Sequence, residues 1–187
     1  MSSASRRRRR PFVVAAAALS MAVTTALGTT AHSAPQRAVT ATLVSDITYQ
    51  IMDHEDWGPN ERCTRTDHSR DGLSEAEAPR SFAFSRTCGG EIRVEIDYKA
   101  RLSHDRSIVI PEGHVKFFEG SSVVTNDEDG GLDFGFTGEP QTIIPGGESR
   151  TRSFYVQNSA EGEPDDHALV TVTWTNVKNY QLHRIGH

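Results

Sequence analysis

Three short segments rich in carboxylates carry the side chains best suited to bind an ion or a ligand. They lie between stretches of alternating apolar and polar residues, so we expect them in the loops of a β-structure. Calcium takes about six to eight oxygen ligands, and such loops can present alternate carboxylates to one ion. The segments are residues 53–56 (Asp-His-Glu-Asp), 126–133 (Asn-Asp-Glu-Asp-Gly-Gly-Leu-Asp) and 161–167 (Glu-Gly-Glu-Pro-Asp-Asp-His).

The second segment predicts a calcium site made by Asp127, Asp129 and Asp133. The two glycines inside it permit a tight turn around an ion. The spacing is not that of an EF-hand, because the last ligand position of such a loop would fall on Phe136, where a bidentate Glu is required. The alternative interpretation is a solvated hairpin loop whose charges keep strand edges from associating.

Two pairs of histidine and aspartate could supply acid–base or transition-metal chemistry. His54 and Asp56 belong to the first acidic segment, and Asp67 and His68 belong to a polar run further along the chain. Neither pair has a recognised metal-ligand spacing. The sequence also lacks the usual motifs of zinc proteases, serine hydrolases and nucleotide-binding proteins. An enzyme would therefore require all four side chains to converge in one cleft.

Trp57 is followed by Gly-Pro and is expected to lie outside the regular strands. A loop tryptophan can stack on a sugar ring while the carboxylates of Asp53 and Asp56 accept hydrogen bonds from sugar hydroxyls. These three residues are therefore a candidate ligand-binding group. The alternative, which we favour for a single loop aromatic, is that Trp57 covers the open end of the fold. Trp174 shares a face with alternating apolar residues and is expected in the core.

Cys63 and Cys88 are the two cysteines of the chain, and we expect a disulfide between them if the protein is exported to an oxidising compartment. The bond would close a loop of about 26 residues and stabilise the fold by about 3.5 kcal/mol in the chain-entropy model. This loop contains the polar run at residues 65–72, which we interpret as an excursion tied to the body of the domain. Free buried thiols, or a Cys63–His68 nucleophile pair, are the alternatives.

A period of two in hydrophobicity runs through most of the chain after residue 34 and predicts β-strands. The clearest example is residues 92–102, where apolar and charged residues alternate without exception, as in a half-buried antiparallel strand. Turns rich in Gly and Pro separate this strand from the others. We expect the others near residues 39–51, 82–84, 108–110, 114–118, 132–136, 153–157 and 168–175.

At least eight short strands predict an all-β fold, in the form of an antiparallel two-sheet β-sandwich of the immunoglobulin-like or Greek-key kind. We expect residues 34–187 to form this one domain, with a core from about residue 38 to residue 178. A chain of this length can bury about two thirds of its unfolded surface without help.

Two local patterns resemble immunoglobulin-like sandwich modules of secreted bacterial proteins. Residues 143–149 (Ile-Ile-Pro-Gly-Gly-Glu-Ser), followed by Ser-Phe-Tyr-Val at 153–156, look like the recurring entry into their penultimate strand. Residues 166–174 (Asp-His-Ala-Leu-Val-Thr-Val-Thr-Trp) are similar to their final strand. The resemblance covers only these stretches and matches no single characterised family. It implies a sandwich fold and carries no functional residue across.

The first 33 residues have the layout of an export signal, which would be removed as a signal peptide. Residues 6–10 are arginine, and residues 12–27 are mostly apolar but shorter than the run of about 20 residues that a membrane-spanning helix needs. We expect cleavage after Ser33, or alternatively after Ala31, and no membrane anchor thereafter. The general secretory route and the twin-arginine route both fit the run of arginines.

Removal of residues 1–33, which contain five Arg and no acidic residue, changes the formal net charge from −5 to −10. An acidic chain without a basic stripe cannot neutralise a phosphate backbone. We therefore expect neither a nucleic-acid partner nor an anionic membrane surface as a partner.

These observations predict a secreted or cell-wall-associated bacterial protein. Its expected function is that of a non-catalytic binding module whose inter-strand loops contact an extracellular protein or a glycan. No cofactor is expected, apart from the calcium ion that the second acidic segment would bind. The alternative is a small extracellular hydrolase or metal-dependent enzyme that uses the two histidine–aspartate pairs.

Overall fold

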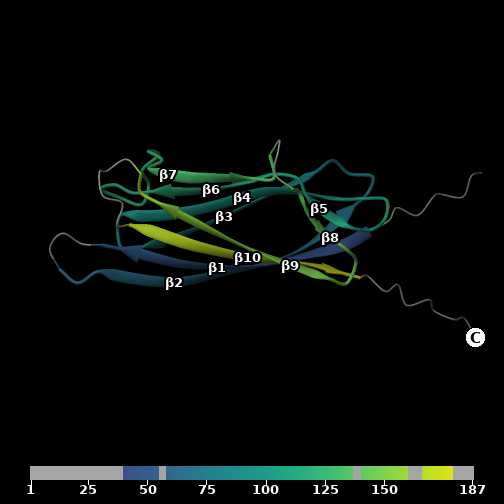
Figure 1. Ribbon diagram of the computed structural model, residues 1–187, viewed down its shortest axis with the longest axis horizontal. Coiled ribbons are helices and arrows are strands. Elements are labelled where there is room, and N and C mark those ends of the chain that lie inside the picture. The colour runs from purple at the N-terminus through teal and green to yellow at the C-terminus, as the bar shows by residue number, and fades with distance from the viewer. Residues whose placement is uncertain (1–39, 55–57, 137–139, 160–165, 179–187) are drawn as a thin grey trace, which may run out of the picture. The chain divides into compact units, whose positions relative to one another are not determined.

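Ten β-strands form the regular structure of the described residues, which are 40–54, 58–136, 140–159 and 166–178 of a computed structural model (Figure 1). No helix occurs among them, and so none that is long and apolar enough to cross a membrane. All of them belong to the unit Arg37–His187. The strands are β1 (Thr40–Asp53), β2 (Glu61–Ser74), β3 (Arg80–Cys88), β4 (Ile92–Leu102), β5 (Ile108–Ile110), β6 (Gly113–Phe118), β7 (Gly130–Phe134), β8 (Thr142–Ile144), β9 (Ser149–Gln157) and β10 (His167–Val177).

The strands form two antiparallel sheets, which confirms the predicted all-β sandwich. The first sheet has the order β2-β1-β10-β9, and β1 pairs with β2 over its whole length. The second sheet follows the path β7-β6-β4-β5-β8, and β3 pairs with β4 beside this path. β4 has the bounds that its alternation predicted, because its apolar residues face the other sheet and its charged residues face outward.

Aromatic rings fill the space between the sheets around Trp174, which is fully buried on β10 as its sequence neighbours predicted. The ring of Tyr98 meets Trp174 edge-on, with ring centroids 5.4 Å apart, and the ring of Phe134 lies 6.2 Å from it. Phe82 stacks on Tyr98, and Phe154 stacks on Phe134. Burial of such rings contributes about 25 cal/mol for each Å² of apolar surface removed from water. The core therefore spans both sheets and is centred on β10 and β4.

The polar run at residues 65–72 is part of β2, and the prediction of a loop excursion there is wrong. The error arises because β2 turns polar side chains rather than apolar ones toward β3. Asp67 pairs with Arg86, and Asp71 pairs with Arg80. Ion pairs between the strands thus take the place of the apolar residues whose alternation usually reveals a strand.

Arginine side chains close the sandwich where β2 and β3 meet. Arg86 donates hydrogen bonds to the carbonyl oxygen of Thr66 at 3.4 Å, and Arg80 donates to that of Gly72 at 3.3 Å. The disulfide joins the start of β2 to the end of β3. Unpaired carbonyl groups on an edge strand invite pairing with another chain, so these bonds protect the long edge of β2.

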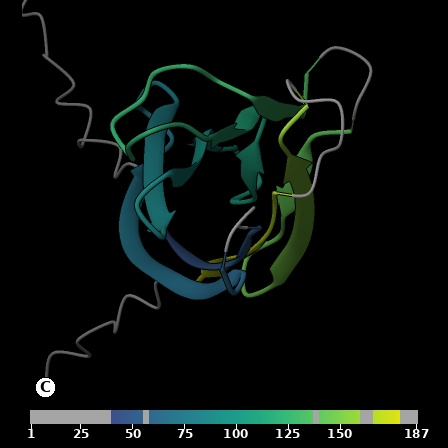
Figure 2. The same cartoon turned by 90° about the vertical axis from the view of Figure 1, so that its left-hand side faces the viewer.

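Glycine at position 130 lets β7 approach β9 at the opposite edge of the sandwich. A Cβ atom at Gly130 would lie 1.9 Å from the carbonyl oxygen of Gln157, which leaves no room for a side chain. Just before β7, the carbonyl oxygen of Asp129 accepts a hydrogen bond of 2.9 Å from the amide of Ser159. β7 therefore begins earlier than the strand predicted at residues 132–136. Figure 2, seen along the strands, shows the two sheets curving around a common interior.

Two buried tyrosines make the fold sensitive to alkaline pH. Burial raises the pKa of Tyr98 to about 12 from its ordinary value of 10.0, and burial together with the Asp67 carboxylate also raises the pKa of Tyr49. Between pH 10 and 12 the unfolded chain releases the Tyr98 proton while the folded chain keeps it. The stabilisation that comes from the raised pKa is therefore fully present below pH 10 and is lost as the pH rises through this window.

We expect the free energy of unfolding to drop by about 3 kcal/mol for Tyr98 across this window. Urea denaturation at a series of pH values measures the drop. The Tyr98→Phe variant, which keeps the ring and loses the hydroxyl bonded to Ser45 at 2.6 Å, should lose less stability in this range than the parent. An equal drop in both proteins would contradict the assignment to Tyr98.

Candidate functional site

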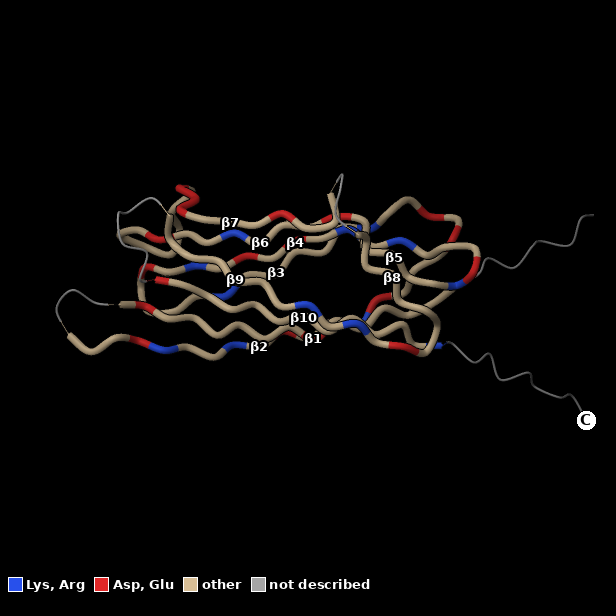
Figure 3. The backbone as a smooth tube through the Cα atoms, in the orientation of Figure 1, with Lys and Arg blue, Asp and Glu red and all other residues tan. Residues whose placement is uncertain are grey.

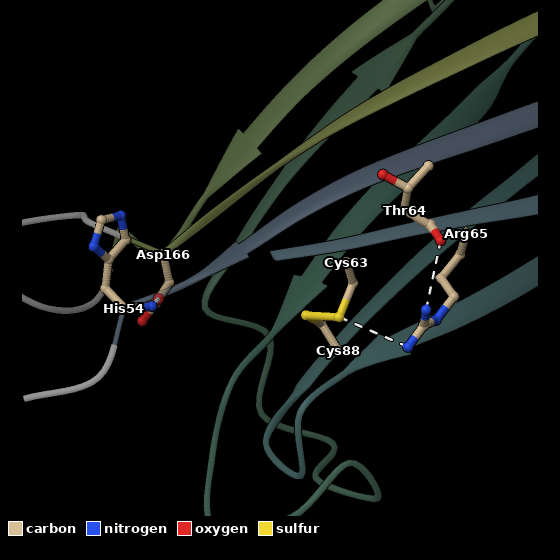
Figure 4. The surroundings of a disulfide bond; sticks show 6 residues. All are labelled: His54, Cys63, Thr64, Arg65, Cys88 and Asp166. Carbon is tan, nitrogen blue, oxygen red and sulfur yellow. Dashed lines mark hydrogen bonds between the residues drawn. A yellow bond between two sulfur atoms is a disulfide. The ribbon is translucent and has the colours of Figure 1, made fainter. Parts of the chain in front are cut away.

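The predicted disulfide between Cys63 and Cys88 is present and fixes one end of the sandwich (Figure 4). Cys63 lies near the start of β2, and Cys88 ends β3 just before the turn at Gly89. Asp53, the last residue of β1, is buried beside Gly89, where a Cβ atom would lie 2.6 Å from the Asp53 carboxylate. The disulfide and this close contact hold the end of β1 and the start of β2 in a fixed position, from which loop residues can present side chains.

His54 is held at this end by contacts through its backbone and its ring. Its amide donates a hydrogen bond of 2.5 Å to the Asp166 carboxylate, which is buried just before β10 (Figure 4). Its ring nitrogen Nδ1 lies 2.9 Å from the side-chain nitrogen of Asn60. The two contacts connect the end of β1 with the residues before β2 and before β10.

Three aromatic side chains are neighbours at this end of the first sheet, and we call them the histidine–tyrosine surface: His54, His167 and Tyr155. The ring centroids of His54 and His167 are 6.0 Å apart, and those of His167 and Tyr155 are 5.4 Å apart. Tyr155 is 53% exposed, so much of its ring is open to solvent. The rings offer flat apolar faces together with nitrogen and hydroxyl groups that donate or accept hydrogen bonds.

Hydroxyl groups continue the same face along β9 and β10 in three rows, which we call the hydroxyl rows. The side-chain oxygens of each pair lie 2.7 to 2.9 Å apart across the two strands. Residues at alternate positions of a strand share one face, so these pairs lie on the side of Tyr155 and His167. The rows are Ser153 with Thr171, Thr151 with Thr173, and Ser149 with Thr175.

This face carries no ionised carboxylate, ammonium or guanidinium group at its outward positions. β10 contains no Lys, Arg, Asp or Glu (Figure 3). The two arginines of β9, Arg150 and Arg152, alternate with the hydroxyl-bearing residues, and Arg152 lies over the inner rings of Phe134 and Phe154. The outward positions of these two strands thus carry no charged side chain, and they include Leu169 opposite Tyr155.

The residues proposed for an enzyme do not converge in the described part of the chain. Asp67 points inward to Arg86, whereas His68, the next residue of β2, points outward and lies 2.7 Å from the carboxylate of Asp46. His54 lies beyond the end of β1, with Asn60 and Asp166 as its partners. The remaining member of the group, Asp56, lies outside the described residues.

The three carboxylates of the predicted calcium site have separate surroundings. The Asp129 carboxylate accepts a 2.7 Å hydrogen bond from the amide of Glu119, and Asp133 on β7 lies 2.5 Å from the ring nitrogen of His114. Asp127 is held through its amide by the hydroxyl of Thr125. Hydrogen bonds of this kind are typical of a hairpin loop, here the one between β6 and β7. Calcium binding by this loop stays a prediction.

Among the described residues, one group of three potential metal ligands lies close together, and it consists of Glu61, Cys63 and Cys88. Both of its sulfur atoms belong to the disulfide, so they are not available as thiolate ligands. The candidate ligand-binding group of Trp57, Asp53 and Asp56 is described only at Asp53, which is buried. Its other two members fall on residues 55–57, outside the described ranges.

Comparison of the chain with protein-family models and with curated proteins gives no match. Sequence reasoning included His167 only as the end of the third acidic segment, and it missed Tyr155 and the hydroxyl rows. The signal that could have found them is the alternation Ser-x-Thr-x-Ser-x-Tyr at residues 149–155, opposite Thr-x-Thr-x-Thr at residues 171–175.

Proposed function

We propose that the protein is a secreted, non-catalytic binding module that holds a glycan on the outer face of β9 and β10. One observation carries the proposal: an exposed aromatic surface continues into three rows of hydroxyl groups on the same neutral face. A sugar chain has the complementary chemistry, because each ring has an apolar side of C–H groups and a rim of hydroxyls.

Tyr155 is the proposed stacking residue. Its ring is half exposed and is supported on one side by the imidazole of His167, 5.4 Å away. Stacking on a rigid, partly supported ring costs little conformational entropy, and the Tyr hydroxyl remains able to bond a sugar hydroxyl. His54 extends the same surface beyond His167.

The hydroxyl rows supply hydrogen bonds along the glycan. Each Ser or Thr hydroxyl has one donor and two acceptor sites, so a hydroxyl that bonds its cross-strand partner keeps capacity for a sugar. From Ser149 to Tyr155 the strand β9 extends over about 20 Å at about 3.3 Å per residue, which is long enough for several sugar rings in a row.

The same face supports binding without hydrolysis. Most glycosidases use two carboxyl groups about 5 to 9.5 Å apart on either side of the scissile bond. The outward positions of β9 and β10 carry no Asp or Glu. A glycan on these two strands would therefore meet no pair of carboxyl groups, because the neighbouring Asp46 of β1, opposite Thr173, is a single carboxylate in contact with His68.

Secretion is part of the proposal and rests on the export signal expected in residues 1–33 together with the Cys63–Cys88 bond. Disulfides persist outside the cytoplasm and are rare within it. We also retain the immunoglobulin-like module as the proposed relationship, since the segments that carry the resemblance correspond to β8, β9, β10 and the turn between β8 and β9.

The test is a binding assay of the purified protein on insoluble polysaccharides, namely cellulose, chitin and peptidoglycan. We expect retention on at least one of them and about tenfold weaker binding by the Tyr155→Ala variant, since an aromatic contact contributes about 0.5 to 1.5 kcal/mol beyond its buried area. Val124→Ala is the matched control, because Val124 is 75% exposed and lies outside β9 and β10. Equal binding by the two variants, or no binding by the parent, would refute the proposal.

A further inference from the structure

A cavity of about 340 Å³ opens where β1 begins and β10 ends, away from the histidine–tyrosine surface. Its walls include the turn between β4 and β5 and the turn between β8 and β9. Its volume lies in the range of small-molecule pockets, which starts at about 300 Å³. The lining residues are Thr40, Ala41, Asp105, Arg106, Gly146, Asn176 and Lys178.

A buried asparagine holds the wall of this cavity in an unusual backbone conformation. Arg106 has a φ of 67°, the left-handed region that residues with a side chain rarely adopt. The side-chain nitrogen of Asn176, which is 1% exposed, donates 2.9 Å hydrogen bonds to the carbonyl oxygens of Arg106 and Ile144. A strained backbone that the surroundings hold in place is a frequent feature of binding sites.

Two cations line the cavity. Neither Arg106 nor Lys178 forms an ion pair with another residue of the described ranges, whereas Arg80, Arg86, Arg93 and Arg150 each pair with an Asp or Glu. The Lys178 side chain lies against the turn at Gly146 and Gly147, where a Cβ atom would be 3.3 and 3.1 Å from its Cε. Gly147, with a φ of 86°, provides the room that this position of the lysine requires.

The single carboxylate of the lining, that of Asp105, forms hydrogen bonds within its own turn. Asp105 accepts hydrogen bonds from the amide of Ser107 at 3.0 Å and from its hydroxyl at 3.1 Å. The bond from the Ser107 amide holds the pKa of Asp105 below its ordinary value, so this carboxylate stays ionised and structural. The lining therefore has one positive charge in excess, although the whole chain has a net charge of −5.

We propose that this cavity binds a small organic anion through Arg106 and Lys178. A planar guanidinium can hold two oxygens of one carboxylate or phosphate group, and the lysine ammonium adds a second charge. The hydroxyl of Thr40 at the rim can bond a polar group on the rest of the ligand. The proposal is independent of glycan binding, because it concerns other residues and a different ligand chemistry.

Titration of the purified, ¹⁵N-labelled protein with inorganic phosphate and, separately, with succinate tests the proposal by NMR. We expect saturable shifts of the amides of Arg106, Ser107, Gly146 and Gly147 with at least one probe. The probe that binds more tightly identifies phosphate or carboxylate as the preferred group. No saturable shift of these amides with either probe would overturn the proposal.

Variants separate a specific site from general charge attraction. Arg106→Gly removes the guanidinium and suits the left-handed φ of this residue, and Lys178→Met removes the ammonium while keeping most of the stem. Each should weaken anion binding at least tenfold with an unchanged melting temperature. Arg70→Ala and Lys116→Met remove one positive charge elsewhere and should leave binding unchanged. An equal loss in these controls would overturn the proposal.

Discussion

Replacement of Cys63 and Cys88 by alanine in one variant is expected to lower the free energy of unfolding by about 3.5 kcal/mol. The bond joins residues 25 positions apart, and its loss frees a loop of that length in the unfolded chain. Since domains are stable by only about 5 to 15 kcal/mol, a loss of this size would leave the fold marginal. Guanidinium denaturation of the variant and the parent at the same pH measures the difference.

Reduction of the parent protein provides the control for this prediction. Dithiothreitol should lower the stability of the parent by a similar amount and leave the double variant unchanged. Reduction should change the structure mainly near the disulfide. The NMR signals of His54 and Asn60 should therefore shift more than those of the turn at residues 103–107. A double variant as stable as the parent would contradict the role given to the disulfide.

Replacement of Trp174 by alanine is expected to destabilise the protein by about 4 kcal/mol, within the usual range of about 3 to 5 kcal/mol for a buried aromatic residue. Trp174 is 0% exposed and contacts the rings of Tyr98 and Phe134 from the centre of the first sheet. Its removal leaves a cavity that rings from both sheets would have to fill. Thermal and urea denaturation both report the loss.

Two further variants set the scale for Trp174→Ala. Trp174→Phe keeps a ring in the core and should lose clearly less stability than the alanine variant. Val124→Ala changes a side chain that is 75% exposed and should alter stability by no more than about 0.5 kcal/mol. If Trp174→Ala lowered the free energy of unfolding no more than Val124→Ala does, this would contradict the packing of the two sheets around Trp174.

The strands that the sequence predicts well are those with one apolar face. β4 is the clearest case, because Ile92, Val94, Ile96 and Tyr98 all face the core and are at most 1% exposed. Alternation of this kind is a local property of the chain, so it can be recognised without knowledge of the partner strands. β5 was likewise predicted with its observed bounds.

β2 could not be predicted in this way, because its inward positions depend on residues far along the chain. The aspartates Asp67 and Asp71 are tolerated on the inner side only because Arg86 and Arg80 of β3 reach them. A buried or half-buried charge requires such a partner, and a single sequence does not say which arginine supplies it. Charge pairing across the sandwich therefore hides a strand of 14 residues.

The candidate site has the same dependence on long-range register. Tyr155 and His167 meet because β9 and β10 are paired with Phe154 opposite Val170, and His54 joins them from the end of β1. The sequence directs attention to charged loops, where ionisable groups are dense. The structure instead places a neutral surface on a sheet face, whose residues are individually common.

The central claim is that a glycan binds on the outer face of β9 and β10. Titration of the ¹⁵N-labelled protein with soluble cello-, chito- and peptidoglycan-derived oligosaccharides tests it most directly, because each amide reports its own surroundings. We predict saturable shifts centred on Tyr155 and His167 that extend through Ser153, Thr171 and Thr173. Shifts confined to other parts of the protein, or none with any of these sugars, would contradict the claim.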